Sequence, residues 1–396
     1  MSVPNFSNSN PVRNDFLVFG SPKIEQEEID EVVKCLKSGW LGTGPRVNEF
    51  ENAFRDYIGS KYAMALNSCT AALHLSMLVS GVSTGDEVIT TPMTFAATAN
   101  AILHTGAKPI FVDVEKDSMN IDPTLIEKVI SPKTKAILPV HFAGRPCNMD
   151  HIMEIAQKNN LLVIEDAAHA VEAKYKGKKI GNIGDMTCFS FYVTKNLVTG
   201  EGGMITTTNE EWAKKIKIHS LHGMTSDAQM RYADKSYKHY QVIAPGFKYN
   251  MMDIQASLGI HQLKRLDKNF DRRKEIWNIY NKAFENLPIT TPSEEKDTVH
   301  GRHLYTLLLD LDNLKISRDE FLGEMVRENI GVGVHFISLH LQPYFKETFG
   351  LKKDDFPNSA FISERTVSIP FSAKLTEKDV QDVINAITKV LNRNMR

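Results

Sequence analysis

Short apolar runs alternate with amphipathic stretches along the first two thirds of the chain. The runs are four to six residues long and rich in β-branched and aromatic side chains, as in strands buried on both faces of a sheet. Between them apolar residues recur at helical spacing, for example at Ile29, Val32, Val33 and Leu36 before Gly39. This alternation predicts an α/β fold with a mostly parallel central sheet covered by helices. The predicted strands cover residues 63–66, 87–91, 110–114, 136–141, 161–165, 187–191 and 204–207.

After Asp253 the pattern changes to long amphipathic helices, and a smaller unit of mixed helices and strands follows. We therefore predict a large domain over residues 16–266 and a smaller α+β C-terminal domain over residues 267–396. The first residues are polar and rich in Asn and Ser, so residues 1–15 are predicted to form a mobile N-terminal arm. In the C-terminal domain the pattern predicts strands near residues 304–309, 331–336 and 367–369, and helices over residues 317–327 and 376–391.

Composition excludes several classes of protein. The chain has 396 residues, 42% of them hydrophobic and 24% charged, and a formal net charge of -1 with the signs interspersed. Nothing in this balance predicts binding to nucleic acid or to an anionic membrane. The 4 cysteines lie far apart and form no CxxC pair, which predicts free thiols and neither disulfides nor a metal site. No apolar run approaches membrane-spanning length and no secretion signal opens the chain, so we expect a cytoplasmic protein.

The stretch from Met186 to Met204 is the strongest candidate for chemistry. It reads MTCFSFYVTKNLVTGEGGM: a strand ends in a polar turn that carries Lys195, with Ser190 nearby, and a glycine-rich corner follows. A strand end beside a glycine corner is where α/β folds present chemistry. Partial burial lowers the pKa of a lysine, and a neutral amine can form a Schiff base. Taken alone, an exposed loop lysine is the commoner case.

Other strand ends offer complementary groups. Thr70 and the backbone N–H of Ala71 open a helix, which favours a phosphate site, although a plain capped helix fits equally well. Asp166 ends an apolar strand and needs a cationic partner such as a protonated pyridine nitrogen, a helix N-cap being the commoner role. Phe95 follows another strand, where it suits stacking on a planar cofactor or packing in the core.

The combination is more specific than any of its members, and it predicts a pyridoxal phosphate site. Lys195 would bind the cofactor as an imine and Asp166 would lie under the ring nitrogen. Thr70 and Ser190 would contact the phosphate, and Phe95 would cover the ring face. The chain contains no GxxxxGK[ST] and no GxGxxG motif, so neither a P-loop nor a dinucleotide site is supported.

From about Phe16 onward the chain resembles the DegT/DnrJ/EryC1/StrS family of sugar-nucleotide aminotransferases. The resemblance is carried by SGWLGTGP, LNSCTAAL, TPMTFAATANAI, FVDV, LPVHFAGRPCNMD, VIEDAAHA, FSFYVTKNLVTGEGGM, PGFKYNMMDIQAS and GVHF. Within the family, it is most similar to the UDP-4-amino-4-deoxy-L-arabinose aminotransferase branch. The resemblance implies a type I aminotransferase fold, pyridoxal 5'-phosphate as cofactor, glutamate as amino donor and a nucleotide-linked keto sugar as acceptor.

The resemblance also implies roles for further residues. His169, where many members have glutamine, would contact the ring oxygen of the cofactor. Cys69 stands where the family usually has glycine before the phosphate-binding threonine. Asn250 would reach the cofactor phosphate of the other subunit, which implies a homodimer with composite active sites. Relatives that dehydrate the sugar have histidine at the position of Lys195, so the lysine argues for amination.

Candidate substrate contacts are Trp40, Leu41, Tyr192, His335 and His340, each equally compatible with a core or loop role. The predicted product is an amino sugar nucleotide, made from a 4-keto sugar, for lipopolysaccharide or another cell-surface glycan. Two alternatives from the same scaffold stay open, a 3-keto sugar aminotransferase and a non-catalytic regulatory protein that binds pyridoxal phosphate. A third alternative, a transaminase of small amino substrates, would require an arginine clamp for carboxylates that the sequence does not locate.

Overall fold

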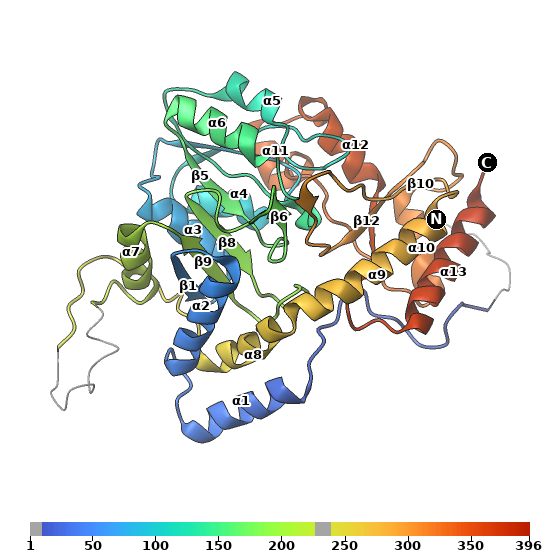
Figure 1. Cartoon of the computed structure of the whole chain (residues 1–396). Coiled ribbons are helices and arrows are strands. Elements are labelled where there is room, and N and C mark those ends of the chain that lie inside the picture. Colours follow the sequence, from blue (N-terminus) through green and yellow to red (C-terminus); the bar gives the residue numbers. More distant parts are fainter. Residues whose placement is uncertain (1–9, 226–238) are drawn as a thin grey trace.

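The computed structural model describes residues 10–225 and 239–396, and a seven-stranded sheet with the strand order β1-β9-β8-β5-β4-β2-β3 lies at its centre (Figure 1). Strands β3, β2, β4, β5 and β8 pair in parallel, whereas β9 runs antiparallel to both β8 and β1. The prediction of a mostly parallel sheet is confirmed, and all of its predicted strands occur with bounds shifted by a few residues. They are β1 (Tyr62–Leu66), β2 (Glu87–Thr90), β3 (Lys108–Phe111), β4 (Thr134–Ile137), β5 (Leu162–Asp166), β8 (Met186–Ser190) and β9 (Gly203–Thr207).

Helices cover both faces of this sheet, because alternate residues of each strand point to opposite sides. The apolar sides of α2, α6 and α8 pack on one face, and those of α3, α4 and α7 pack on the other. Each face thereby carries its own hydrophobic core. The helices are α2 (Pro45–Ile58), α3 (Cys69–Val79), α4 (Ala96–His104), α6 (Met149–Asn159), α7 (Glu210–Ser220) and α8 (Asp253–Lys264).

Strand direction decides which residues meet. Because β9 runs against both of its neighbours, β1 points the same way as β8 and the other parallel strands. The carboxyl ends of β1, β2, β5 and β8 therefore lie at one edge of the sheet. One of these ends is Asp166 itself, and the phosphate-site candidate, Phe95 and Lys195 follow the other three. The topology therefore gathers groups that are far apart in the sequence.

The C-terminal part has a core of its own, built around a three-stranded antiparallel sheet with the order β10-β12-β13. Its largest buried side chains include Trp277 and Tyr280 of the long helix α9. Within the described residues, no helix combines the length and the apolar character needed to cross a membrane. The remaining elements are α1 (Gln26–Ser38), α5 (Pro123–Ile126), β6 (Lys174–Tyr175), β7 (Lys178–Lys179), α9 (Leu266–Phe284), β10 (Ile289–Thr290), β11 (Thr298–Val299), β12 (Tyr305–Leu309), α10 (Arg318–Arg327), α11 (Pro343–Phe349), α12 (Pro357–Arg365), β13 (Thr366–Ile369) and α13 (Glu377–Asn394).

The strand predicted near residues 331–336 does not form. Backbone bonding in this segment is divided between two partners: the N–H of Gly331 donates to the Leu17 carbonyl, and Gly333 exchanges two backbone hydrogen bonds with Ser368 of β13. Single bridges to different segments do not build a continuous ladder, so the chain stays irregular here.

The predicted N-terminal arm is anchored at its C-terminal end, while residues 1–9 lie outside the described residues. Arg13 is buried and pairs with Asp379 at 2.7 Å and with Asp382 at 2.8 Å, both in α13. Because a buried guanidinium with two carboxylates is costly to separate, Arg13 is anchored to the C-terminal core, whereas Asn14 and Asp15 beside it are exposed.

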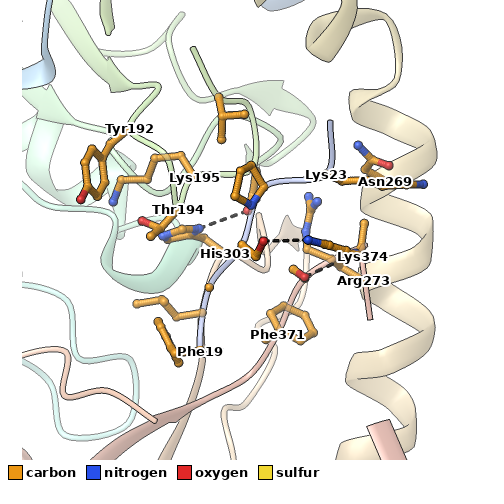
Figure 2. Close-up of a pocket in the computed structure, with 18 of the residues that line it drawn as sticks. Phe19, Lys23, Tyr192, Thr194, Lys195, Asn269, Arg273, His303, Phe371 and Lys374 are labelled. Carbon is orange, nitrogen blue, oxygen red and sulfur yellow. Dashed lines mark hydrogen bonds between the residues drawn. The ribbon is translucent and has the colours of Figure 1, made fainter. Parts of the chain in front are cut away.

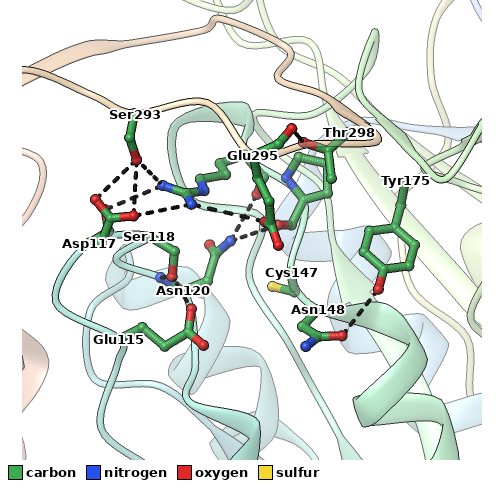
Figure 3. Close-up of polar contacts among 12 residues, drawn as sticks. Glu115, Asp117, Ser118, Asn120, Cys147, Asn148, Tyr175, Ser293, Glu295 and Thr298 are labelled. Atoms are coloured by element: carbon green, nitrogen blue, oxygen red, sulfur yellow. Dashed lines mark hydrogen bonds and ion pairs between the residues drawn. The ribbon is translucent and has the colours of Figure 1, made fainter.

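Polar contacts also join the segment between β10 and β11 to the large domain (Figure 3). Arg145 donates to Ser293 Oγ at 2.8 Å and pairs with Asp117 at 3.4 Å, and Ser293 Oγ in turn donates to the Asp117 carboxylate at 3.0 Å. This loop, which belongs to the predicted small domain by sequence, is thus bonded to the segments that follow β3 and β4 of the large sheet.

Candidate active site

The edge of the sheet where the parallel strands end holds a cavity of about 500 Å³. Both residues that the sequence assigned to catalysis line it, together with most of the other predicted contacts. The cavity draws on segments that follow β1, β2, β5 and β8 and on the C-terminal half of the chain. The predicted site residues that line it are Thr70, Phe95, Asp166, His169, Ser190, Tyr192, Lys195 and His335.

Lys195 lies in the turn that follows β8. Its backbone N–H donates to the carbonyl of Tyr192 at 2.8 Å, which closes the turn and directs the side chain into the cavity. Burial lowers the pKa of the Lys195 amine to about 8, although the nearby Cys69 and Asp166 act in the opposite direction. A much larger fraction of this amine is neutral near pH 8 than of an exposed lysine, so it is suited to act as a nucleophile and as a base.

Asp166 is the last residue of β5, and both of its carboxylate oxygens are held in place. Thr98 Oγ1 donates to Oδ2 at 2.7 Å, and the backbone N–H of Ala168 donates to Oδ1 at 3.1 Å. Burial raises the pKa of the Asp166 carboxyl, while these two bonds and the positive charge of Lys195 favour the ionised form. A cation bound against this carboxylate would offset its burial, and a protonated pyridine nitrogen is such a cation.

The N-terminus of α3 opens into the same cavity and carries Thr70, with Ser190 of β8 on the lining beside it. Free N–H groups and the helix dipole make such an end favourable for a phosphate group. One predicted donor is not available, because the N–H of Ala71 donates to Ser68 Oγ at 3.1 Å and Ala71 does not line the cavity. The amide of Ala71 is thus used by the helix cap, and its predicted contact with the cofactor phosphate stays a prediction.

Two glycines of the GEGGM motif are needed for close packing around this helix end. A Cβ atom at Gly203 would lie 2.5 Å from the carbonyl carbon and oxygen of Ser68, and one at Gly202 would lie 2.2 Å from Thr199 Oγ1. Both distances are far below van der Waals contact. Strand β9 can thus approach the start of α3 only because these positions carry no side chain.

His169 is buried on the floor of the cavity and faces it as a neutral ring. Its Nδ1 accepts a hydrogen bond from the N–H of Ala143 at 3.2 Å, and burial holds the pKa of His169 well below its usual value. The ring proton therefore resides on Nε2, which makes this atom a donor. The ring also stacks on Phe336 at 6.1 Å and lies 4.5 Å from His303, between ring centroids.

A buried polar network that the sequence did not reveal holds the residue next to Lys195. Asn196 Nδ2 donates to Glu172 Oε2 at 2.9 Å and to the carbonyl of Gly301 at 3.0 Å, and its Oδ1 lies 3.1 Å from His303 Nδ1. Glu172 in turn forms a buried ion pair with Arg273 of α9. The lysine turn is thereby fixed to both halves of the chain, through residues whose sequence separation hides their contact.

Thr98 is a further site residue that sequence reasoning missed. It lies in the first turn of α4, and its hydroxyl oxygen is 2.7 Å from that of Thr94, which precedes the helix.

Besides Ala71, four predicted contacts do not line this cavity in their own chain. Trp40 and Leu41 are exposed in the loop between α1 and α2. Asn250 donates to Thr43 Oγ1 at 2.6 Å and lines a neighbouring hollow. His340 is fully buried, bonds to Ser338 Oγ at 2.8 Å and packs on an aromatic ring. His340 is therefore a core residue in this chain, which favours the core role that the sequence had left open.

The cavity fits pyridoxal phosphate on the chemistry of its groups: a partly neutral amine, a buried carboxylate that forms no ion pair among the described residues, a helix N-terminus with hydroxyls and an aromatic ring at Phe95. Each group has a counterpart on this cofactor, namely an aldehyde, a ring nitrogen, a phosphate and a ring face. Within the described residues, no cluster of side chains could hold a metal ion.

Comparison with known proteins agrees with this chemistry. Residues 22–388 match the DegT/DnrJ/EryC1/StrS aminotransferase family. The chain is 49% identical to SpsC of Bacillus subtilis, a spore coat polysaccharide biosynthesis protein, over 96% of this chain and 98% of SpsC. It superposes with a TM-score of 0.90 and 33% identity on Spr1654 of Streptococcus pneumoniae in its PMP form, over 95% of this chain and 99% of that one.

A third relative, DesI, was solved in the presence of its TDP-sugar product; the TM-score is 0.85 with 26% identity, over 96% of this chain and 94% of DesI. Spr1654 is also known in its PLP form, with a TM-score of 0.89. These matches establish the type I aminotransferase fold and the pyridoxal phosphate cofactor that the sequence predicted. The chain belongs to the DegT/DnrJ/EryC1/StrS aminotransferase family and is a PLP-dependent sugar aminotransferase.

Proposed function

We propose that this enzyme transfers the amino group of glutamate to a nucleotide-linked 4-keto sugar. The observation that carries the proposal is the meeting of Lys195, Asp166 and the N-terminus of α3 in one cavity. Pyridoxal phosphate, when bound there, supplies the electron sink that stabilises negative charge on the carbon bearing the amino group. Asp166 holds a proton on the pyridine nitrogen, and Thr98 and Ala168 orient its oxygens.

In this proposal Lys195 Nζ acts first as the base that removes the proton from the carbon bearing the amino group of the donor. The protonated amine then acts as the acid that gives the proton back at a second carbon. Its lowered pKa supports this role, because only the neutral amine can accept a proton and burial increases the neutral fraction. Thr70, Ser190 and the end of α3 bind the phosphate, and Phe95 and His169 orient the ring.

Similarity to two relatives supports the proposal that the acceptor sugar is linked to a nucleotide. DesI was solved with a TDP-sugar product, and SpsC acts in the synthesis of a polysaccharide. The test is a panel of UDP-, dTDP- and GDP-linked 4-keto and 3-keto sugars with glutamate as donor, followed by NMR of the products to locate the new amino group. Amination of nucleotide-linked 4-keto sugars alone is expected. Amination of free sugars, or of 2-oxo acids only, would contradict the proposal.

We also propose that two copies of the chain form a homodimer with composite sites. Helix α1 forms as the sequence predicted, yet Ile29, Val33 and Leu36 on its apolar face are 48%, 40% and 53% exposed. Trp40, just beyond this helix, is 53% exposed. An apolar face of this size is expected to be covered by another surface, and a second copy would bring Asn250 towards a cofactor cavity that it does not line in its own chain.

Complementation tests this arrangement. Homodimers of Lys195→Ala and of Asn250→Ala are each expected to be nearly inactive, since the first lacks the base and the second a phosphate contact. Heterodimers purified with two different tags should regain about half of the wild-type activity per dimer, because a two-fold arrangement leaves one site intact. If the residues of one site came from a single chain, every site would carry a defect, and verified heterodimers would stay inactive.

A further inference from the structure

His303 is a buried side chain beside the reactive lysine to which no role has been given so far. It lies between β11 and β12, is 5% exposed, and lines a cavity of about 260 Å³ that Lys195 also lines (Figure 2). Lys195 lines the cofactor cavity as well, whereas His303 does not. His303 is therefore a neighbour of the lysine rather than of the cofactor.

The orientation of Asn196 determines where the ring proton of His303 resides. The amide nitrogen of Asn196 donates to Glu172 Oε2 at 2.9 Å and to the Gly301 carbonyl at 3.0 Å. A reversed amide would place its oxygen against these two acceptors. Asn196 Oδ1 therefore lies 3.1 Å from His303 Nδ1, and because this oxygen only accepts, Nδ1 carries the proton.

The other ring nitrogen, His303 Nε2, is left as an acceptor. Burial and the nearby charge of Lys195 hold the pKa of His303 well below its usual value, so the ring is neutral. A neutral ring with its proton on Nδ1 has a lone pair on Nε2. No described residue donates to this atom. A buried acceptor without a partner is costly, so a donor is expected to reach it.

The Lys195 amine is the lysine on this lining that is free to be that donor. Lys23 pairs with Glu25 at 3.0 Å, and Lys374 donates to Ser21 Oγ at 2.8 Å. Lys195 Nζ has no hydrogen-bond or ion-pair partner among the described residues. An unpartnered donor and an unpartnered acceptor thus share one lining.

His169 provides a contrast that shows how specifically the ring protons are set. Its Nδ1 accepts from the N–H of Ala143, so its proton lies on Nε2, opposite to the case of His303. The two rings are only 4.5 Å apart between centroids. Different neighbours therefore prepare one histidine as a donor in the cofactor cavity and the other as an acceptor beside the lysine.

We propose that His303 is a positioning residue for the catalytic amine: its Nε2 accepts a hydrogen bond from Lys195 Nζ whenever the amine is free of the cofactor, and Asn196 sets the tautomer that permits this bond. The proton that Lys195 takes from the donor carbon stays on Nζ until it is returned to the second carbon, and His303 remains neutral throughout. The inference rests on the proposed role of Lys195 as the base, whichever sugar accepts the amino group.

Nitrogen-15 NMR of the enzyme, labelled in its histidine rings and loaded with PLP or PMP, tests the tautomer. His303→Gln removes one pair of resonances and thereby assigns them. We expect the proton on Nδ1 in both forms, and an Nε2 resonance that shifts in the PMP form, where the amine of Lys195 is free. Asn196→Ala should lose the preference for Nδ1. A wild-type proton on Nε2, or an Nε2 resonance identical in both forms, would overturn the proposal.

Kinetics tests what the bond does. His303→Leu is expected to slow the conversion of the PLP-loaded enzyme by saturating amino donor about tenfold or more, as for loss of one hydrogen bond to a charged group, with KM within about twofold. His303→Gln keeps an acceptor near the position of Nε2 and should stay within about threefold of wild type. Equal rates in the two variants, both slow or both unchanged, would show that the ring only packs.

His300 is the matched control. It is buried, its Nδ1 accepts from the N–H of Arg302 at 2.9 Å, its ring lies 4.9 Å from that of Trp277, and it lines neither cavity. His300→Leu should lower the melting temperature and leave the rate unchanged. If no amino donor converts the PLP-loaded enzyme, the proposed reaction fails, while the tautomer of His303 and its response to PMP still decide this inference.

Discussion

Replacing Lys195 with alanine is expected to lower the rate of amino transfer by about a thousandfold or more, and to abolish covalent retention of the cofactor after borohydride reduction. The amine is the only group lining the cofactor cavity among the described residues that combines a lowered pKa of about 8 with nucleophilic character. A positioned general base alone accounts for 10² to 10⁴ in rate. Turnover measured with glutamate and the acceptor, together with peptide mass spectrometry of the reduced protein, checks both expectations.

Lys179 provides a matched control for this experiment. Burial also lowers the pKa of Lys179 to about 8, and its amine lies 3.0 Å from the centre of the Tyr57 ring. Yet Lys179 lies outside the cavity, so Lys179→Ala should keep both activity and the covalent label on Lys195. Label on any other lysine, or turnover of Lys195→Ala within tenfold of wild type, would show that a different group is the base.

The sequence alone predicted the residues that line the cofactor cavity at the strand ends. Each of the main site residues lies at or just after the end of an apolar strand of the large sheet: Thr70, Phe95, Asp166 and Lys195. Parallel strands bring such positions to one edge. Their meeting in one cavity was therefore predictable from local patterns combined with one rule of topology. The same reasoning recovered the sheet, since its strands are continuous apolar runs.

Contacts between distant segments were not predictable in this way. The bond between Lys374 and Ser21 and the pair of Arg273 with Glu172 join residues that no local pattern relates. His340 follows the same histidine- and aromatic-rich stretch as His335, yet it turns into the core while His335 lines the cavity. Which way such a side chain points depends on tertiary packing rather than on the residue type.

Asn250 and the exposed face of α1 illustrate a different limit. The helix was predictable from its spacing, but the spacing implied burial, and within one chain Ile29, Val33 and Leu36 remain exposed. Amphipathic spacing shows that a face needs a partner without saying whether the partner lies in the same chain. The predicted phosphate contact of Asn250 likewise cannot be judged from one chain, because it depends on a second copy.

The second large effect is expected at Asp166. In Asp166→Asn the side chain keeps its shape, so the bond from Thr98 to the side-chain oxygen can persist and the protein should still bind pyridoxal phosphate. A neutral amide, however, cannot hold the proton on the pyridine nitrogen by charge. We expect kcat to fall by about a hundredfold or more, which corresponds to about 2.7 kcal/mol of transition-state stabilisation.

The size of this loss separates a catalytic role from a structural one. Asp113 is a matched control: it is buried, follows β3 of the same sheet and accepts backbone N–H bonds from Asn358 and Ser359 at 2.9 Å, outside the cofactor cavity. Asp113→Asn should lower the melting temperature but leave kcat of the folded enzyme within about threefold. Asp166→Asn should show the reverse pattern, with cofactor content near wild type. A loss in kcat below tenfold, about 1.4 kcal/mol, would mean that the burial and hydrogen bonds of Asp166 serve the fold and that another group keeps the ring nitrogen protonated.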